Sequence, residues 1–381
     1  MRLWRQWSRR VATAVAPVVM LAATPATTLA AETGRVQALA AFQAAMDRGW
    51  VEAVVSVSRA QPILEFAQTV AGWELKYRGS VAPSVLGFYE PAGSASRVVH
   101  LDALTHGAPQ EWLVGDRSGA PGLLRLIAFN NPSSVQIRSG AQPWDTGGIL
   151  SIMTRTNATA AVYRAAQRLG WNAFNDPVVL NLPDSGVKLT NVIVRGPDGV
   201  NVSVYERLNP RMSDDPDLRK LRRPFNSMQS VRSIERARDF YVQVLGFELL
   251  NKGDFYNPVR EPNNFGVPAN LVPGNPLPFT IVGPKKDGPT QVELLEFRGI
   301  EGRDLTANAV PPNLGILALR FPVSDLSAIQ KRLAGFNWPI ARAPTNLELA
   351  PYGQVEMLAV QSPDGAWLEF VQLAPGAQKS K

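Results

Sequence analysis

Residues 225–248, FNSMQSVRSIERARDFYVQVLGFE, contain a strand, a helix and the start of a second strand. Residues 225–231 have a strand pattern, and Ser233 is placed to cap the helix that follows. Apolar side chains then recur at helical spacing. The helix can end at Gly246, because glycine adopts positive φ without strain. The stretch therefore predicts a strand-helix-strand unit.

The glycine-aromatic pair that ends this helix occurs four times along the chain. The pairs are Gly72-Trp73, Gly170-Trp171, Gly246-Phe247 and Gly335-Phe336. In each case a helical pattern comes before the pair and a strand pattern comes after it. A repeat of this size predicts one strand-helix-strand-strand-strand module used four times, and so an α+β fold.

The first module is the most divergent of the four. Its predicted helix covers residues 63–70, and its predicted strands cover residues 53–57, 85–89, 98–101 and 123–129. The third module carries a proline-rich insertion at 254–278. A loop of this length is expected either to cover a site or to lack fixed structure, and the sequence does not decide between them.

Modules two and four end in the same tight turn, Pro197-Asp198-Gly199 and Pro363-Asp364-Gly365. Proline presets φ in such a turn and glycine supplies the positive value. The repeat is thus also pairwise, which predicts two halves. We expect an N-terminal domain at 32–210, a linker at 211–223 and a C-terminal domain at 224–381.

The first 31 residues have the features of an export signal. Four arginines precede a short apolar run and a segment rich in small residues, with a cleavage site expected near Ala30 or Ala31. The apolar run is too short to span a bilayer of ~30 Å. We therefore expect a periplasmic or secreted protein without a stable membrane span.

Composition narrows the classes of partner. The formal net charge is +7, but the predicted signal accounts for four of the positive charges, and no basic stretch with interleaved aromatic residues occurs. Nucleic acid is therefore not an expected partner. The chain has no cysteine, which excludes disulfides and thiolate chemistry. A small molecule is the expected partner, bound by a monomer or a homodimer.

The later modules resemble the vicinal oxygen chelate superfamily, which includes glyoxalase I, bleomycin-resistance proteins and extradiol dioxygenases. The likeness rests on residues 225–248 and on SPDGAWLE at 362–369, and it is weaker over 150–207. It implies that two modules pair so that their strands curl into a half-open trough. We therefore expect two glyoxalase-like domains with curved mixed sheets, one formed by modules one and two and the other by modules three and four.

In that family a divalent metal in the trough is held by residues from the first and last strands of the paired modules. The resemblance places Asn226 at the first-strand position of module three, and Glu293 and Glu369 at last-strand positions. The other positions are then taken by Glu52, by Gly148 or Ile149, by Gly315 or Ile316, by Ser203 and by Arg125. Both histidines, His100 and His106, fall outside these positions.

The missing histidines imply that the usual metal chemistry is lost, although Glu293 and Glu369 in one trough could hold a hard cation. We expect the chain to bind, and to convert if it is an enzyme, a hydrophobic small molecule with neighbouring oxygens. Glu293 or Glu369 would then move a proton and Asn226 would orient a carbonyl.

Three alternatives remain open at this stage. The chain could be a metal-free binding or sequestering protein of the bleomycin-resistance type. The N-terminal half could be a structural partner whose trough is blocked by side chains such as Arg125. His100, Tyr352 and Trp367 could each line a site or be ordinary packing residues.

Overall fold

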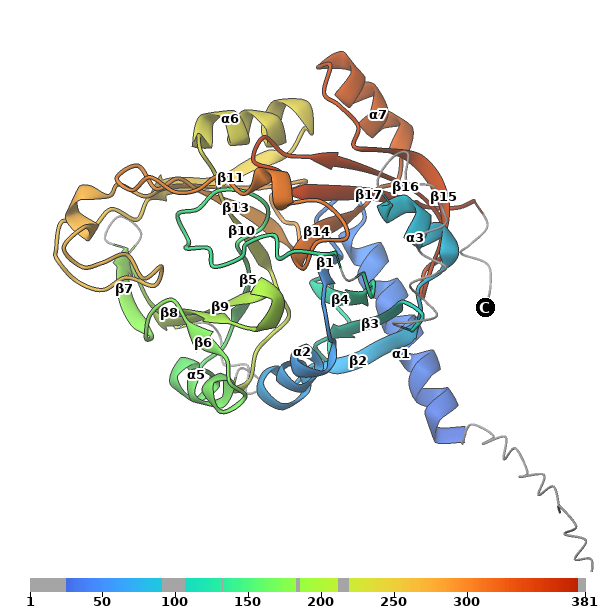
Figure 1. Ribbon diagram of the computed structural model, residues 1–381, viewed down its shortest axis with the longest axis horizontal. Coiled ribbons are helices and arrows are strands. Elements are labelled where there is room, and N and C mark those ends of the chain that lie inside the picture. Colours follow the sequence, from blue (N-terminus) through green and yellow to red (C-terminus); the bar gives the residue numbers. More distant parts are fainter. Residues whose placement is uncertain (1–24, 91–106, 132, 183–185, 212–218, 376–381) are drawn as a thin grey trace, which may run out of the picture.

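Two curled, mixed β-sheets form the body of the protein (Figure 1). The computed structural model describes residues 25–90, 107–131, 133–182, 186–211 and 219–375, and the side chains from residue 32 onward. None of the helices in these ranges is long and apolar enough to cross a membrane. Residues 1–24 of the predicted signal lie outside the described residues, whereas the predicted cleavage site near Ala30 or Ala31 falls within helix α1 (Pro25–Ala45).

Sheet I has eight strands and combines the first module with the fourth. Its central strands pair antiparallel, with Glu52 opposite Arg320. The strands in spatial order are β15 (Arg342–Leu349), β16 (Gly353–Gln361), β17 (Trp367–Leu373), β14 (Gly315–Pro322), β1 (Glu52–Ser56), β4 (Leu123–Ala128), β3 (Gln110–Gly115) and β2 (Glu74–Ser80).

Sheet II combines the second module with the third. Its central strands also pair antiparallel, with Asn226 opposite Met153. The strands in spatial order are β11 (Glu248–Asp254), β12 (Pro278–Gly283), β13 (Gln291–Leu295), β10 (Asn226–Ser230), β5 (Ser151–Arg155), β9 (Asn201–Asn209), β8 (Val187–Arg195) and β6 (Asn172–Ala173), and β7 (Val178–Leu182) also pairs with β8.

The predicted fold class is confirmed, but the predicted pairing of modules is wrong. Modules one and two do not share a sheet, and neither do modules three and four. The reason lies in the connections: residues 133–150 and 296–314 carry the chain from one sheet to the other. These two crossover segments lie together, with bridges from Gln136 to Leu314 and from Thr146 to Asp304. The linker at 211–223 instead joins two modules of the same sheet.

The two Pro-Asp-Gly turns tie the sheets to each other. Asp198, in the turn before β9 of sheet II, accepts a hydrogen bond of 2.7 Å from the backbone N–H of Ser58, just after β1 of sheet I. Asp364, in the turn before β17 of sheet I, accepts one of 3.0 Å from the N–H of Arg232, just after β10 of sheet II. Each carboxylate therefore links the end of one sheet to the other.

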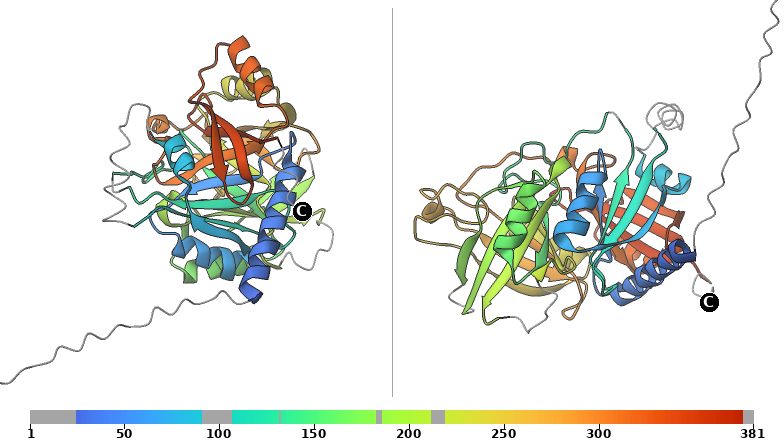
Figure 2. Two further views of the ribbon diagram at one scale, coloured as in Figure 1. Left: turned by 90° about the vertical axis from the view of Figure 1, so that its right-hand side faces the viewer. Right: turned by 90° about the horizontal axis from the view of Figure 1, so that it is seen from below.

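Helices cover one face of each sheet and share a core between the sheets (Figure 2). Phe66 stacks on Trp171 with ring centroids 4.0 Å apart, and Phe240 lies 4.6 Å from Trp338. The helices are α2 (Gln61–Glu65) continued by π-helix η1 (Phe66–Ala71), α5 (Thr159–Arg168), α6 (Ile234–Asp239) continued by π-helix η5 (Phe240–Val244), and α7 (Leu326–Gly335).

The glycine-aromatic pairs end the helices as predicted in three modules. Gly72, Gly170 and Gly246 have φ of 72°, 80° and 78°. The fourth pair differs, because Gly335 is still helical and Asn337 takes the positive φ, at 51°. Asparagine tolerates this conformation better than most residues, so the turn moves two positions along the chain.

The other face of each sheet lines a hollow, and the two hollows are filled differently. Hollow I, on sheet I, is packed by α1 (Pro25–Ala45) and α3 (Pro83–Tyr89), which contribute Phe42 and Phe88 to its core. Residues 85–89 were predicted as a strand, which is wrong; Pro83 in the first turn starts a helix instead. The strand predicted at 98–101 lies outside the described residues.

Hollow II, on sheet II, is covered by the proline-rich insertion. Phe265, Val267 and Val272 of the insertion are buried against Met228 and Ile193 of the sheet. The insertion is therefore a lid and not an unstructured loop. Hollow II is covered by this single loop, whereas hollow I is covered by two helices.

Candidate functional site

A buried cluster of charged side chains fills the floor of hollow I. Arg125 donates from Nε to Glu52 Oε1 at 2.7 Å, and Arg320 donates from Nε to Glu369 Oε2 at 2.8 Å. Arg320 also contacts Glu52, so the cluster crosses from β1 to β14. All four side chains are completely buried. The cluster is therefore held by charge pairing in a dry environment.

Further polar groups close this charged cluster on both sides. Tyr352 donates to Glu52 Oε2 at 2.9 Å, and Tyr89 donates to Glu369 Oε1 at 2.7 Å. Burial alone would raise the pKa of Glu52, but Arg125 and Arg320 outweigh it and hold that pKa below its usual range. Burial and the neighbouring carboxylate raise the pKa of Tyr89 well above its ordinary value. Each hydroxyl therefore stays protonated as a donor.

The charged cluster does not fit a metal ion. Two of its members are guanidinium groups, which stay protonated and have no lone pair to offer. The alternative in which Arg125 blocks a trough fits this arrangement, but the trough belongs to modules one and four. Glu369 and Tyr352 therefore act here as packing and pairing groups, and Trp367 lies buried in the same core.

Asn226 and Glu293 lie together on the floor of hollow II. Asn226 Nδ2 donates to Glu293 Oε2 at 2.8 Å. Glu293 is 4% exposed, and burial raises its pKa to about 7 because only the Asn226 hydrogen bond opposes the effect. Asn226 Oδ1 is buried without a hydrogen-bond partner in the described part of the chain. The pair thus offers one protonatable oxygen and one unused acceptor.

A polar row continues from this pair across the sheet. Met153 is registered with Asn226 on one side and with Ser203 on the other. Asn191 Nδ2 donates to Ser203 Oγ at 3.0 Å, and Asn264 of the lid donates to Asn191 at 2.9 Å. The lid is therefore hydrogen-bonded to the floor of hollow II through side-chain amides.

The lid encloses a cavity of about 610 Å³ between the two edges of sheet II. Phe255 and Phe279, stacked with centroids 4.3 Å apart, line it together with Tyr256 and Phe265. The polar part of the wall consists of the amide side chains of Asn181, Asn251, Asn257, Asn263, Asn264 and Asn275 and of the charged side chains of Lys252, Asp254 and Glu261. A wall that combines aromatic rings with several polar side chains suits a small molecule with an apolar body and a few polar groups.

Asp254 holds the neck of the lid. Its Oδ1 accepts the backbone N–H of Tyr256 at 2.7 Å and of Leu277 at 2.9 Å. Phe255 N–H also donates to the Leu277 carbonyl at 2.9 Å. These contacts fix both ends of the insertion against the sheet.

The prediction that one hollow is surrounded by Asn226, Glu293 and Glu369 is wrong for Glu369. Asn226 and Glu293 are brought together, but Glu369 is in the other sheet and is bound to Arg320. A cation shared by Glu293 and Glu369 is therefore not possible. Glu52 is part of the charged cluster, and His100 and His106 lie outside the described residues.

The donors in hollow II also fit a metal ion poorly. The four positions that correspond to the charged cluster by strand register hold Asn226, Glu293, Met153 and Ser203. Only one of these is a carboxylate and none is an imidazole, whereas divalent metals in such sites need several N or O donors. No group of three His, Asp or Glu able to hold a metal occurs in the described ranges.

Arg320 and Met153 were missed because the expected positions, Gly315 or Ile316 and Gly148 or Ile149, lie four to five residues too early. The first-strand position lies 20 residues before the glycine of the glycine-aromatic pair in modules one and three, but 17 residues before it in module two and 15 in module four, so a count calibrated on the longer modules overshoots. A usable signal for Arg320 is present: it is a charged residue within an apolar strand, as Arg125 is. A charge in such a run must be paired on folding.

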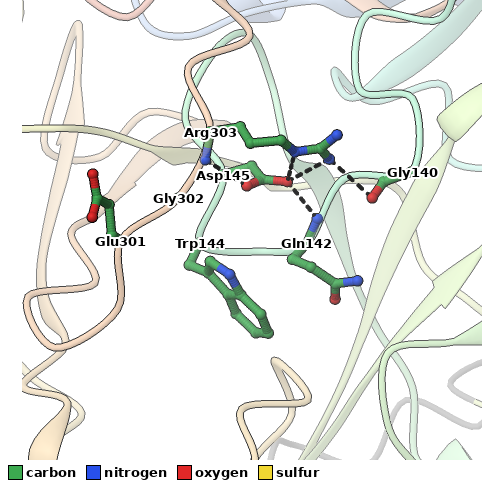
Figure 3. A pocket seen from close by; sticks show the side chains of 7 residues that line it. All are labelled: Gly140, Gln142, Trp144, Asp145, Glu301, Gly302 and Arg303. Carbon is green, nitrogen blue, oxygen red and sulfur yellow. Dashed lines mark hydrogen bonds and ion pairs between the residues drawn. The ribbon is translucent and has the colours of Figure 1, made fainter.

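A second cavity, of about 520 Å³, lies where the crossover segments meet (Figure 3). Arg303 pairs with Asp145 there at 2.7 Å, and its N–H also donates to the Gly140 carbonyl at 2.9 Å. Trp144 and Glu301 complete the wall. The Arg303 guanidinium already binds groups of the protein itself. These contacts join the two crossover segments.

The fold and hollow II define a protein built from paired strand-helix-strand-strand-strand modules around a ligand-sized trough. Residues 226–370 match the family model of the Glyoxalase/Bleomycin resistance protein/Dioxygenase superfamily. The matched residues cover the third module, which is part of sheet II, and the fourth module, which is part of sheet I. The predicted resemblance is confirmed.

Solved structures with the same fold include glyoxalase I from Zea mays. A single-residue variant of that enzyme matches with a TM-score of 0.53 at 15% identity over 89% of this chain and 96% of that one. The unaltered enzyme gives 0.53 at 14% identity over 85% and 92%. A dioxygenase candidate from Bacillus subtilis gives 0.50 at 12% identity over 88% of each chain. These likenesses establish the fold. Among curated protein sequences none matches this chain.

Replacing Arg320 by methionine should lower the free energy of unfolding by about 3–5 kcal/mol, because it leaves the buried Glu52 and Glu369 carboxylates without a partner. Urea denaturation measures the change. The control is Arg238→Met, which removes an exposed ion pair with Asp239 and should cost less than about 1 kcal/mol. Equal effects of the two substitutions would show that the charged cluster does not stabilise the fold.

Replacing Glu293 by glutamine should change the pH dependence of stability. The folded pKa of Glu293 is raised from 4.5 to about 7, so the wild-type protein loses stability as pH rises through this window while the variant does not. The variant should gain up to about 3 kcal/mol relative to wild type between pH 4.5 and pH 8. Denaturation at several pH values tests this, with the exposed Glu348→Gln as control; a pH-independent difference contradicts it.

Proposed function

We propose that the protein binds a small, mainly hydrophobic molecule with neighbouring oxygen atoms in hollow II. The observation that carries this proposal is the contrast between the hollows. The floor of hollow I is filled by paired charges and covered by α1 and α3. Hollow II keeps a cavity of about 610 Å³ under a lid, and Glu293 lies in the same cross-strand row as Asn251 of the cavity wall.

Asn226 and Glu293 are the proposed polar anchors of the ligand. Asn226 Oδ1 has no partner among the described residues and can accept a hydrogen bond from a ligand hydroxyl. Glu293, with a pKa of about 7, is partly protonated near neutral pH and can donate to a ligand carbonyl. A donor and an acceptor side by side complement a molecule that carries two adjacent oxygens.

Proton transfer is the second candidate function, favoured by the raised pKa of Glu293. A carboxyl group that titrates near neutral pH can act as general acid or base at a carbon next to a carbonyl. Asn226 would orient the carbonyl, and its floor neighbours Met153 and Ser203 have no group that titrates in this range. We propose binding without a metal ion as the shared first step of both functions.

We also propose that the protein is exported. The support is the sequence of the first 31 residues, with its arginines, short apolar run and small residues. Cleavage near Ala30 would leave the packing residues of α1, Ala38, Ala41 and Phe42, in the mature protein. The mass of protein recovered from an envelope fraction tests the proposal; an intact N-terminus contradicts it.

Binding in hollow II can be tested with the uncharged dye Nile red, whose fluorescence rises in apolar pockets. Asn181 is exposed on β7 and lines the cavity, so Asn181→Trp should fill the cavity mouth and weaken dye binding at least tenfold. Asn172→Trp, at an exposed position outside the cavity lining, should leave binding unchanged. Dialysis against EDTA should have no effect. Equal dye affinities for both variants would remove the cavity from the proposal.

A further inference from the structure

One end of hollow II carries two arginines on the ligand-facing side of the sheet. Arg155 is two residues beyond Met153 on β5, and Arg207 is four residues beyond Ser203 on β9. Side chains two apart on a strand share a face, so both arginines point to the same side as the polar row. Arg155 is registered with Tyr205, between Ser203 and Arg207, so the two arginines are neighbours across the strands.

Arg155 is held in place but not neutralised. Its guanidinium lies over the ring of Phe225 at 3.8 Å, and its Nε is buried with no hydrogen-bond partner in the described part of the chain. Burial, together with Arg223 and Arg207, lowers its pKa. Of the described groups that act on its charge, two are arginines and none is a carboxylate. Stacked guanidinium groups are well suited to bind planar oxyanions.

Arg207 completes the pair. Its Nε donates to the Tyr205 hydroxyl at 3.3 Å, and its side chain is partly exposed. Leu189, opposite Arg207 on β8, is in turn opposite Leu180, which lines the cavity. On the other side of the sheet, Asn251 of the cavity wall is opposite Ile281, which is opposite Glu293. Leu180 and Asn251 of the cavity wall therefore lie in the same cross-strand rows as Arg207 and Glu293, each two strands away from its row partner.

The strand spacing sets the distance between the arginines and the Asn226–Glu293 pair. Asn226 is opposite Met153, and Arg155 is two residues farther along β5. Two residues of extended strand span about 6.6 Å. A ligand of the size of one substituted ring can therefore reach both places at once.

We propose that Arg155 and Arg207 bind the carboxylate of the ligand, so that the ligand is a small aromatic or hydrophobic acid. Its carboxylate lies at the two arginines, and its hydroxyl or carbonyl oxygen lies at Asn226 and Glu293. This inference rests on the proposed function, since it specifies the class of molecule bound in hollow II. A ligand carboxylate would supply the negative charge that the described residues around Arg155 do not.

The test compares two probes of the same shape, 4-hydroxybenzoate and 4-hydroxybenzamide, by calorimetry on the full-length protein. The carboxylate should bind wild type at least tenfold more tightly than the amide. Arg155→Met and Arg207→Met should each remove most of this preference, while amide and Nile red affinities stay within twofold. Arg168→Met, at an exposed position of α5, is the matched control and should change nothing.

The outcomes separate this inference from the proposed function. Equal affinity for both probes, with Nile red still bound, overturns the carboxylate site and leaves hollow II as a binding site. Loss of all binding, including that of Nile red, counts against both. Inorganic phosphate that displaces 4-hydroxybenzoate at equal concentration would show a general oxyanion site and overturn the assignment to a carboxylate.

One control addresses the acidic linker of the chain itself. Asp214, Asp215 and Asp217 are close in sequence to Arg222 and Arg223, and they lie outside the described residues. A chain with all three changed to asparagine should bind 4-hydroxybenzoate as wild type does. A gain of more than tenfold would show that the linker competes for the arginines and would overturn the proposal.

Discussion

The contact between Glu52 and Arg320 is the constraint on which the rest of the architecture depends. It joins the central strands of sheet I, which come from opposite ends of the chain. In a dry interior such a pair has a high desolvation cost, and the attraction offsets it only while every partner is present. Arg125, Glu369, Tyr89 and Tyr352 supply those partners. The charged cluster thus holds the two modules of sheet I in one register more than it adds net stability.

The two hollows show how one module plan can serve two purposes. Strand register places Glu52 and Arg320 of sheet I where sheet II has Asn226 and Met153. Opposite charges in the first case close the hollow by pairing with each other. In the second case a lone carboxyl, Glu293, has only an amide beside it, and its pKa rises. The difference between a sealed and a usable hollow therefore depends on a few side chains.

The fold could be predicted because the strand-helix-strand pattern and the turn residues are local properties of the chain. The positions of Asn226 and Glu293 followed from the same repeat, and they do lie together. The partner of each sheet could not be predicted, because four similar modules present four similar edge strands. What decides between them is the path of residues 133–150 and 296–314, which has no periodic signal. The placement of Glu369 was wrong for this reason alone.

Because each half of the chain contributes strands to both sheets, the halves are interlocked rather than adjoining. Strands of residues 52–209 and strands of residues 226–373 meet at the central pair of each sheet, β1 with β14 and β10 with β5. A protease that cuts between residues 211 and 219 would leave two fragments that remain paired along the central strands of both sheets. Separation would require both sheets to open at their centres. The molecule thus resembles a domain-swapped dimer whose two halves belong to one polypeptide.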